Sequence, residues 1–149
     1  MNQNELKKLL ESLINLPKEN EWVEFKTNYV SIEEIGELIS ALSNSACLHN
    51  QPFGYLVFGV ENESHKIVGT TFKPKSDKKG NEELENWLAQ RLSPRIDFRI
   101  FEFFFDEKQI SLFEVPSVKN EPVSFLHEEY IRVGSITRKL KDLVVSNTS

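Results

Sequence analysis

The chain has 149 residues, a formal net charge of −5 and a single cysteine, Cys47. This length suits one domain with a substantial core, and one cysteine excludes an internal disulfide and any multi-cysteine metal site. No apolar run approaches the ~20 residues that span a bilayer, so we expect no membrane partner and a cytoplasmic location. The acidic total argues against non-specific nucleic-acid binding, but every arginine lies beyond residue 90, where a local basic face can form.

The first half of the chain predicts two helices and two strands. Leucine and isoleucine at helical spacing predict a helix within residues 4–16. The segment "WVEF" (22–25) alternates between two faces and is a strand candidate, and Ser31 with Glu34 fits a capping box that opens a second helix. The apolar run "GYLVFGV" (54–60) predicts a central strand that is covered on both faces.

The second half predicts a helix, a hairpin and a last strand. Residues 61–66 are expected to form a turn into a short strand at 67–72, and the polar segment 73–80 is expected to be a loop. "NEELENWLAQRL" predicts a helix capped by Asn81, and "RIDFRIFEFFF" with "ISLFEV" predicts an antiparallel hairpin. "EYIRVGS" predicts a last strand, followed by a short helix or a tail. The expected fold is therefore a single α+β domain with a mixed, mostly antiparallel sheet flanked by helices.

Several common sites are not indicated by the sequence. No G-x-x-x-x-G-K-[ST] phosphate loop occurs, so no ATP site is expected. His49, His65 and His127 have no second histidine or cysteine at ligand spacing, so zinc is not expected. The candidate chemistry is left to carboxylates, glycines and arginines.

Four segments, in order along the chain, resemble the AlbA-like domain of the Schlafen family, which is also described as a divergent AAA or DNA-binding domain. They are "ENEWVEFKTN", "ISALSNS", "FGYLVFGVEN" and "EPVSFLHEEYIRVGS". This resemblance implies a domain at 19–142, preceded by an N-terminal helix at 1–18. Residues 143–149 are then a tail or the start of a linker to a further C-terminal module.

The resemblance also implies a set of carboxylates. Some Schlafen members are metal-dependent endoribonucleases that act on structured RNA such as transfer RNA, and their first two carboxylates correspond to Glu19 and Glu24. The third corresponds to Glu61 or to Asn62, and Asn62 departs from the pattern because it brings no charge. Mg²⁺ or Mn²⁺ held by Glu19, Glu24 and Glu61, with Lys26 stabilising charge on the phosphate, would form the catalytic site.

These glutamates have simpler interpretations as well. Glu19 and Glu24 are five positions apart and point to opposite faces of a straight strand, so they converge only if the chain bends. Glu19 and Glu21 can equally be solvated loop charges. Glu24 can have a structural role, paired with Lys26 or with an arginine.

A second candidate site follows the last strand. If Val133 is buried, then Arg132 faces outward, because neighbouring strand residues point to opposite faces. A turn with free backbone N–H groups would then lie beside a basic cluster suited to phosphate contacts. The candidate nucleic-acid-binding residues are Lys26, Arg132, Ser135, Arg138 and Lys139, and the alternative is a plain surface cluster.

Three functions remain open at this point. The favoured one is a nucleic-acid-binding domain, acting on DNA or RNA, in the N-terminal part of a bacterial transcriptional regulator. The second is a metal-dependent endoribonuclease, which Asn62 argues against. The third is a dimerisation domain without a nucleic-acid ligand. A homodimer is also expected. Two related lobes form a groove in Schlafen proteins, and a chain with one lobe would build the same groove by pairing with a second copy. The phenylalanine-rich run at 101–105 offers an interface.

Overall fold

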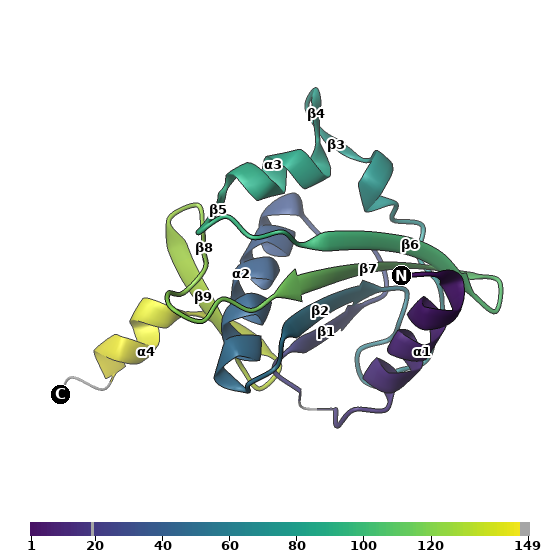
Figure 1. Ribbon diagram of the computed structural model, residues 1–149, viewed down its shortest axis with the longest axis horizontal. Coiled ribbons are helices and arrows are strands. Elements are labelled where there is room, and N and C mark those ends of the chain that lie inside the picture. The colour runs from purple at the N-terminus through teal and green to yellow at the C-terminus, as the bar shows by residue number, and fades with distance from the viewer. Residues whose placement is uncertain (19, 147–149) are drawn as a thin grey trace.

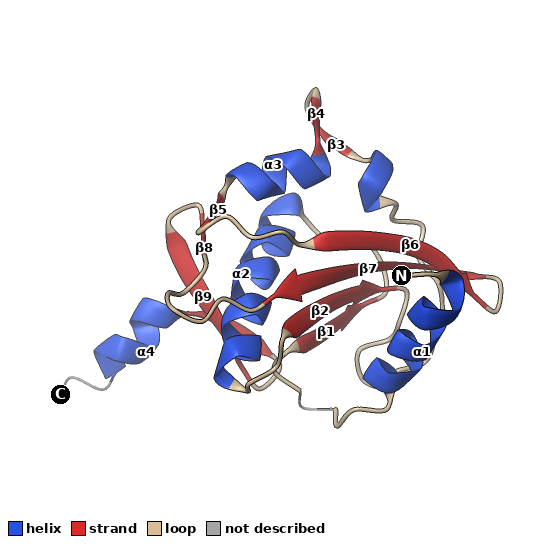
Figure 2. Ribbon diagram, in the orientation of Figure 1, coloured by secondary structure: helices blue, strands red, loops and turns tan. Residues whose placement is uncertain are grey.

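The computed structural model describes residues 1–18 and 20–146 and consists of two four-stranded sheets that both pack on helix α2 (Ile32–Leu48) (Figure 1). The first sheet has the order β1 (Val23–Lys26), β2 (Phe53–Phe58), β7 (Lys108–Pro116), β6 (Arg99–Phe105). The second has the order β10 (Ile136–Lys139), β9 (Glu128–Val133), β8 (Ser124–Phe125), β5 (Leu92–Ser93). Figure 2 separates the helices from the strands and confirms the expected α+β class.

The remaining elements are short or lie at the edges of this frame. The helices are α1 (Gln3–Ile14), α3 (Leu84–Gln90), α4 (Leu140–Ser146) and a 3-10 turn (Pro74–Ser76). A small ladder joins β3 (Lys78–Lys79) to β4 (Glu82–Glu83). No helix in the described part of the chain is long and apolar enough to cross a membrane.

The chain order β1–α2–β2 forms a parallel crossover unit. β1 pairs parallel with β2, from Val23 opposite Tyr55 to Lys26 opposite Phe58. β2 then pairs antiparallel with β7, and β7 with β6, so β2 lies inside the sheet. α1 covers one face of this sheet and α2 the other, which buries β2 on both sides.

Helix α2 is buried on nearly all sides, and its polar residues bind the second sheet. The Ser40 hydroxyl donates to the Val123 carbonyl at 2.7 Å, and the Asn44 amide donates to the carbonyls of Val123 and Tyr130 at 3.0 and 2.7 Å. The Ser45 hydroxyl accepts from the backbone N–H of Arg132 at 3.0 Å. Buried polar groups must find such partners, so "ISALSNS" is the stretch of α2 that positions β9.

The structure corrects three sequence expectations in the 61–146 region. The expected strand at 67–72 is reduced to a single bridge between Val60 and Ile67. α3 begins at Leu84 with Glu83 as its cap residue, rather than after Asn81, because residues 82–83 are held in the β3–β4 ladder. The predicted last strand, β9, is followed by a further strand, β10, and then by α4. The tail expected from residue 143 begins within α4, and residues 147–149 lie outside the described part.

Gly36 allows α2 to approach β8 closely, and this contact gives a stability prediction. A Cβ at Gly36 would overlap the ring of Phe125. Helix propensity alone would make Gly36→Ala about 1 kcal/mol more stable, but overpacking costs about 1–3 kcal/mol, so we expect a net loss in the free energy of unfolding. Denaturant titration measures it.

The double mutant Gly36→Ala/Phe125→Leu is the control. In the Phe125→Leu background the ring is absent, so the added methyl group should cost less than it does in the parent chain. Equal costs in the two backgrounds would contradict the packing explanation.

Candidate nucleic-acid interface

A buried ion pair links the first sheet to the second. Val23 and Phe25 of β1 face α1, so the alternation of the strand turns Glu24 and Lys26 to the opposite face. There the Arg132 Nη2 of β9 donates to the Glu24 Oε1 at 2.8 Å, and the two side chains are only 2% and 8% exposed. The Lys26 Nζ lies 3.4 Å from the Glu24 Oε2. Both carboxylate oxygens of Glu24 are therefore in contact with a cation.

Arg132 is oriented opposite to the sequence argument. Val133 is 43% exposed, whereas Arg132 is 3% exposed, because the guanidinium turns inward to the Glu24 carboxylate. Its Nη1 donates to the Thr137 hydroxyl at 3.4 Å. The Arg132 Nε has no acceptor among the residues that the structure describes. Arg132 is thus part of a buried network and not of an exposed basic cluster.

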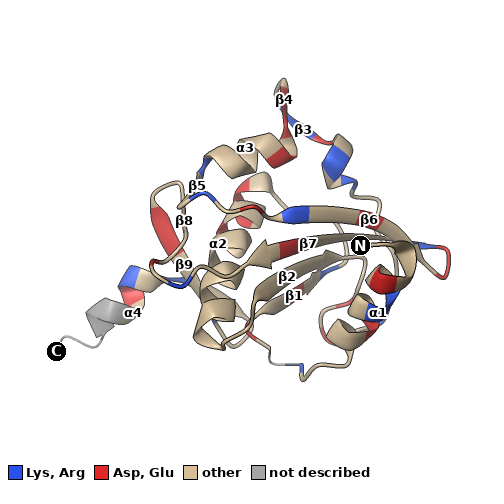
Figure 3. Ribbon diagram, in the orientation of Figure 1, with Lys and Arg blue, Asp and Glu red and all other residues tan. Residues whose placement is uncertain are grey.

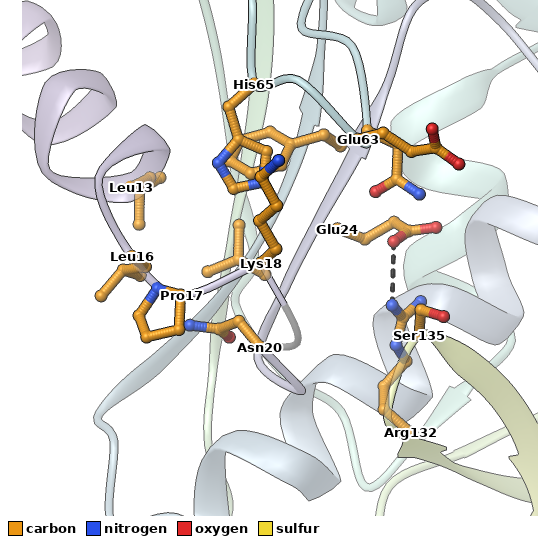
Figure 4. A pocket seen from close by; sticks show the side chains of 13 residues that line it. Leu13, Leu16, Pro17, Lys18, Asn20, Glu24, Glu63, His65, Arg132 and Ser135 are labelled. Atoms are coloured by element: carbon orange, nitrogen blue, oxygen red, sulfur yellow. Dashed lines mark hydrogen bonds and ion pairs between the residues drawn. The ribbon is translucent and has the colours of Figure 1, made fainter.

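Two pockets meet at this ion pair, and Glu24, Arg132 and Ser135 line both of them. We call the first the α1 pocket (Figure 4). Its volume is about 350 Å³, and it lies between the end of α1, the chain before β1, the turn at 62–65 and the β9–β10 turn. We call the second the α2 pocket; its volume is about 270 Å³, and it is lined by Glu34 and Glu37 of α2 as well.

At the turn after β2, the acid that lines the α1 pocket is Glu63 and not Glu61, which was predicted as the third carboxylate. Asn62 and Glu63 line the α1 pocket, and Glu61 is not among its lining residues. The turn after β2 accounts for this, because it is closed by backbone bonds between Glu61 and Lys66 and between His65 and Glu61. The His65 Nδ1 lies 2.8 Å from the Ile14 carbonyl, which fixes the turn against α1. Sequence reasoning missed Glu63, for which only its position in the "ENES" turn was a signal.

Glu19 lies outside the described residues, and its neighbour Glu21 has a specific role. The Glu21 Oε2 accepts from the backbone N–H of Gly134 at 2.6 Å, and its Oε1 lies 2.7 Å from the His49 Nε2. The Gly134 hydrogen bond and the His49 contact lower the pKa of Glu21 below its ordinary value of 4.5. The interpretation of Glu21 as a merely solvated charge is therefore wrong: it ties the β9–β10 turn to the start of β1.

The predicted basic cluster is divided by the β9–β10 hairpin. Ser135, at the turn, is exposed and lines both pockets. Arg138 and Lys139 are exposed on β10, where successive side chains point to opposite faces. Lys139 lies 3.8 Å from Glu128. Figure 3 shows that lysines and arginines are interspersed with acidic residues over the fold.

The α2 pocket is acidic on its helix side. Burial and the neighbouring Glu34 raise the pKa of Glu37 above its ordinary value. Lys26 lies 3.9 Å from Glu34 and is shared between that residue and Glu24. The acidic residues of this pocket would repel a phosphate group, so the α1 pocket suits an anionic ligand better.

The described residues do not fit a divalent metal ion. Within residues 1–18 and 20–146 no group of three or more histidine, cysteine, aspartate or glutamate side chains could hold one. Glu24 already satisfies an arginine and a lysine, and a metal would have to compete with both. Glu19 lies outside the described residues, so the predicted Mg²⁺ or Mn²⁺ site at Glu19, Glu24 and Glu61 stays a prediction.

The fold and the segments around this ion pair are those of a known class of domain. The chain belongs to the Schlafen family: the sequence model described as "Schlafen, AlbA_2" matches residues 19–141. No curated protein matches the chain. The family resemblance of the four sequence segments is thereby confirmed.

Two solved structures share the fold. The DIP2311 protein of Corynebacterium diphtheriae is 18% identical with a TM-score of 0.54, over 92% of this chain but only 26% of that one. The N-terminal domain of a protein of Nitrosomonas europaea, described as related to the ATP-dependent DNA helicase RecG, is 19% identical with a TM-score of 0.52, over 93% of both chains. This chain thus spans about a quarter of the first structure and nearly all of the second.

Removing Arg132 should strongly destabilise the protein. Arg132→Ala leaves the Glu24 carboxylate buried without its arginine, and breaking a buried pair in this way costs about 3–5 kcal/mol. Chemical denaturation measures the loss. Arg138→Ala, at an exposed arginine of β10, is the control and should change stability by less than about 0.5 kcal/mol. A small effect of Arg132→Ala would mean that the pair is not a structural constraint.

The lowered pKa of Glu21 predicts a pH-dependent stability. Its folded-state pKa lies below 4.5, so its stabilising contribution is complete above pH 4.5 and is lost as the pH falls through the lower folded value. We expect Glu21→Gln to be less stable than the parent near neutral pH and the difference to vanish in acid. Denaturation at a series of pH values measures it. Glu85→Gln, on α3, controls for the loss of one charge, and a pH-independent difference for Glu21→Gln would contradict the assignment.

Proposed function

We propose that this chain is a nucleic-acid-binding domain that uses the α1 pocket and its rim. The observation that carries the proposal is that Lys18, Arg132 and Ser135, from three separate segments, line one pocket. Lysine and arginine side chains, together with hydroxyl groups, are the usual partners of phosphate oxygens. Membership of the Schlafen family supports the same class of ligand.

The comparison structures support the proposal at a coarse level. One of them comes from a protein described as related to a DNA helicase, which acts on nucleic acid. That likeness does not distinguish DNA from RNA as the ligand. The proposal that the domain serves a bacterial transcriptional regulator also goes beyond it. The expected homodimer is also a proposal. It is supported by β6, which is the edge strand of its sheet and offers Phe104, 56% exposed, as an interface residue.

The endoribonuclease is the less favoured function. Its carboxylates would be Glu19, Glu24 and Glu61, with Lys26 beside them, but Glu24 is engaged by Arg132 and Lys26 and Glu61 does not line the pocket. A domain that binds nucleic acid without cleaving it does not need a free carboxylate at any of these positions. We therefore place binding first.

Fluorescence anisotropy with labelled single-stranded RNA, single-stranded DNA and duplex DNA tests the proposal. Two phosphate contacts, made by Lys18 and Arg132 on a single strand, predict a slope of about −1.4 in log affinity against log salt, so affinity should fall about 7-fold between about 50 and 200 mM salt. Lys18→Gln, at an exposed position, should weaken binding and reduce the slope by about 0.7.

Lys8→Gln makes the same charge change at an exposed position of α1, away from the pocket lining, and should bind like the parent chain. If none of the three nucleic acids binds at low salt, the proposal fails. Running the same samples on a gel after incubation with Mn²⁺ separates the alternatives, because cleavage that disappears in a Glu24→Gln variant shown by thermal unfolding to be folded would favour the nuclease.

A further inference from the structure

The α1 pocket has one apolar side and one polar side. The apolar side is formed by Leu13, Leu16, Pro17, Val23 and Phe25. The polar side carries Lys18, Asn20 and Arg132. The two turns beside the pocket add Asn62, Glu63, His65 and Ser135. Figure 4 shows Lys18 and Arg132 on opposite sides of the pocket, with Glu24 beside Arg132. A volume of about 350 Å³ lies at the small end of the range for ligand pockets and has no room for a base-paired duplex.

Two buried N–H groups of this pocket have no acceptor. The Asn20 Oδ1 accepts from the backbone N–H of Trp22 at 2.8 Å, which assigns the amide orientation and leaves the Asn20 Nδ2 without a partner. Arg132 uses its Nη1 and Nη2, so its Nε is left without one. Among the described residues these are the only buried side-chain nitrogen or oxygen atoms without a partner, and both residues line the α1 pocket.

The chemistry of these two groups defines the ligand. Both are donors only, so the missing partner must supply acceptor oxygens. Buried donors without acceptors are rare in folded proteins, and those that persist call for a specific explanation. Glu24 and Glu63 both line the pocket and would repel an anion, but the Glu24 charge is balanced by Arg132 and Lys26, and Glu63 is exposed, so solvent screens its charge. A group with several oxygens and a negative charge, such as a phosphate, therefore meets the two donors and the Lys18 ammonium.

We infer that the α1 pocket binds the terminal phosphate of a nucleic-acid strand and the single nucleotide that carries it. The inference rests on the proposed function and narrows it to strand ends. A terminal phosphate monoester offers three oxygens and more negative charge than an internal diester, and a pocket of this size suits a single nucleotide. The apolar side of the pocket then faces the sugar and base of the terminal nucleotide.

Anisotropy with a short single strand bearing a 5′-phosphate, a 3′-phosphate or only hydroxyl ends tests this inference. We expect one phosphorylated end to bind about 10-fold more tightly than the hydroxyl end, which corresponds to about 1.4 kcal/mol. Asn20→Asp keeps the acceptor for the Trp22 N–H but replaces the free donor with a charged oxygen, so it should abolish this preference. Asn120→Asp makes the same change at an exposed site outside the α1 pocket and should keep it.

The outcomes separate this inference from the proposed function. Equal binding of all three ends would overturn the inference and leave the proposed function standing, whereas no binding of any strand would overturn both. Inorganic phosphate should compete with the phosphorylated strand, whereas a chain that binds inorganic phosphate but shows no preference for a phosphorylated end would overturn the strand-end assignment. If Asn20→Asp does not fold, as judged by thermal unfolding, the exposed Lys18→Gln takes its place and should reduce the preference.

Discussion

The buried ion pair between Glu24 and Arg132 is the constraint on which the rest of this domain depends. It joins β1 of the first sheet to β9 of the second, and the Arg132 backbone is held in turn by Ser45 of α2. Two buried charges are tolerated only because each satisfies the other, and either one alone would carry a large desolvation cost. The pair therefore fixes the relative position of two sheets that share no strand.

The same pair shapes the chemistry of the site. It separates the α1 pocket from the α2 pocket, and the acidic residues of α2 lie on the far side of it. In engaging both oxygens of Glu24 it makes this carboxylate a structural anchor rather than a free ligand for a metal. A position that the Schlafen family resemblance assigned to catalysis thus serves, in this chain, to build a pocket whose two unpartnered buried groups, Asn20 Nδ2 and Arg132 Nε, are donors.

Much of the fold could be predicted from local patterns. The cap at Ser31, the strands β1 and β2 as elements and the β6–β7 hairpin follow from spacing and alternation, which depend on residues close in the chain. The start of α3 could not be predicted in this way, because the β3–β4 ladder competes for residues that otherwise favour a helix. Of the residues that line the two pockets, the sequence had named Glu24, Lys26, Arg132 and Ser135 as candidates, but not Glu63 or Asn20.

The sequence by itself determined the family, the longer helices and strands, and the presence of polar residues beside the first strand. The tertiary structure alone decided which way Arg132 points, what Glu21 binds and which acid reaches the pocket. These outcomes depend on contacts between residues 108 and 113 positions apart, Arg132 with Glu24 and Gly134 with Glu21. No local pattern encodes such a contact, because the energy of a buried charge depends on which distant partner the fold brings to it.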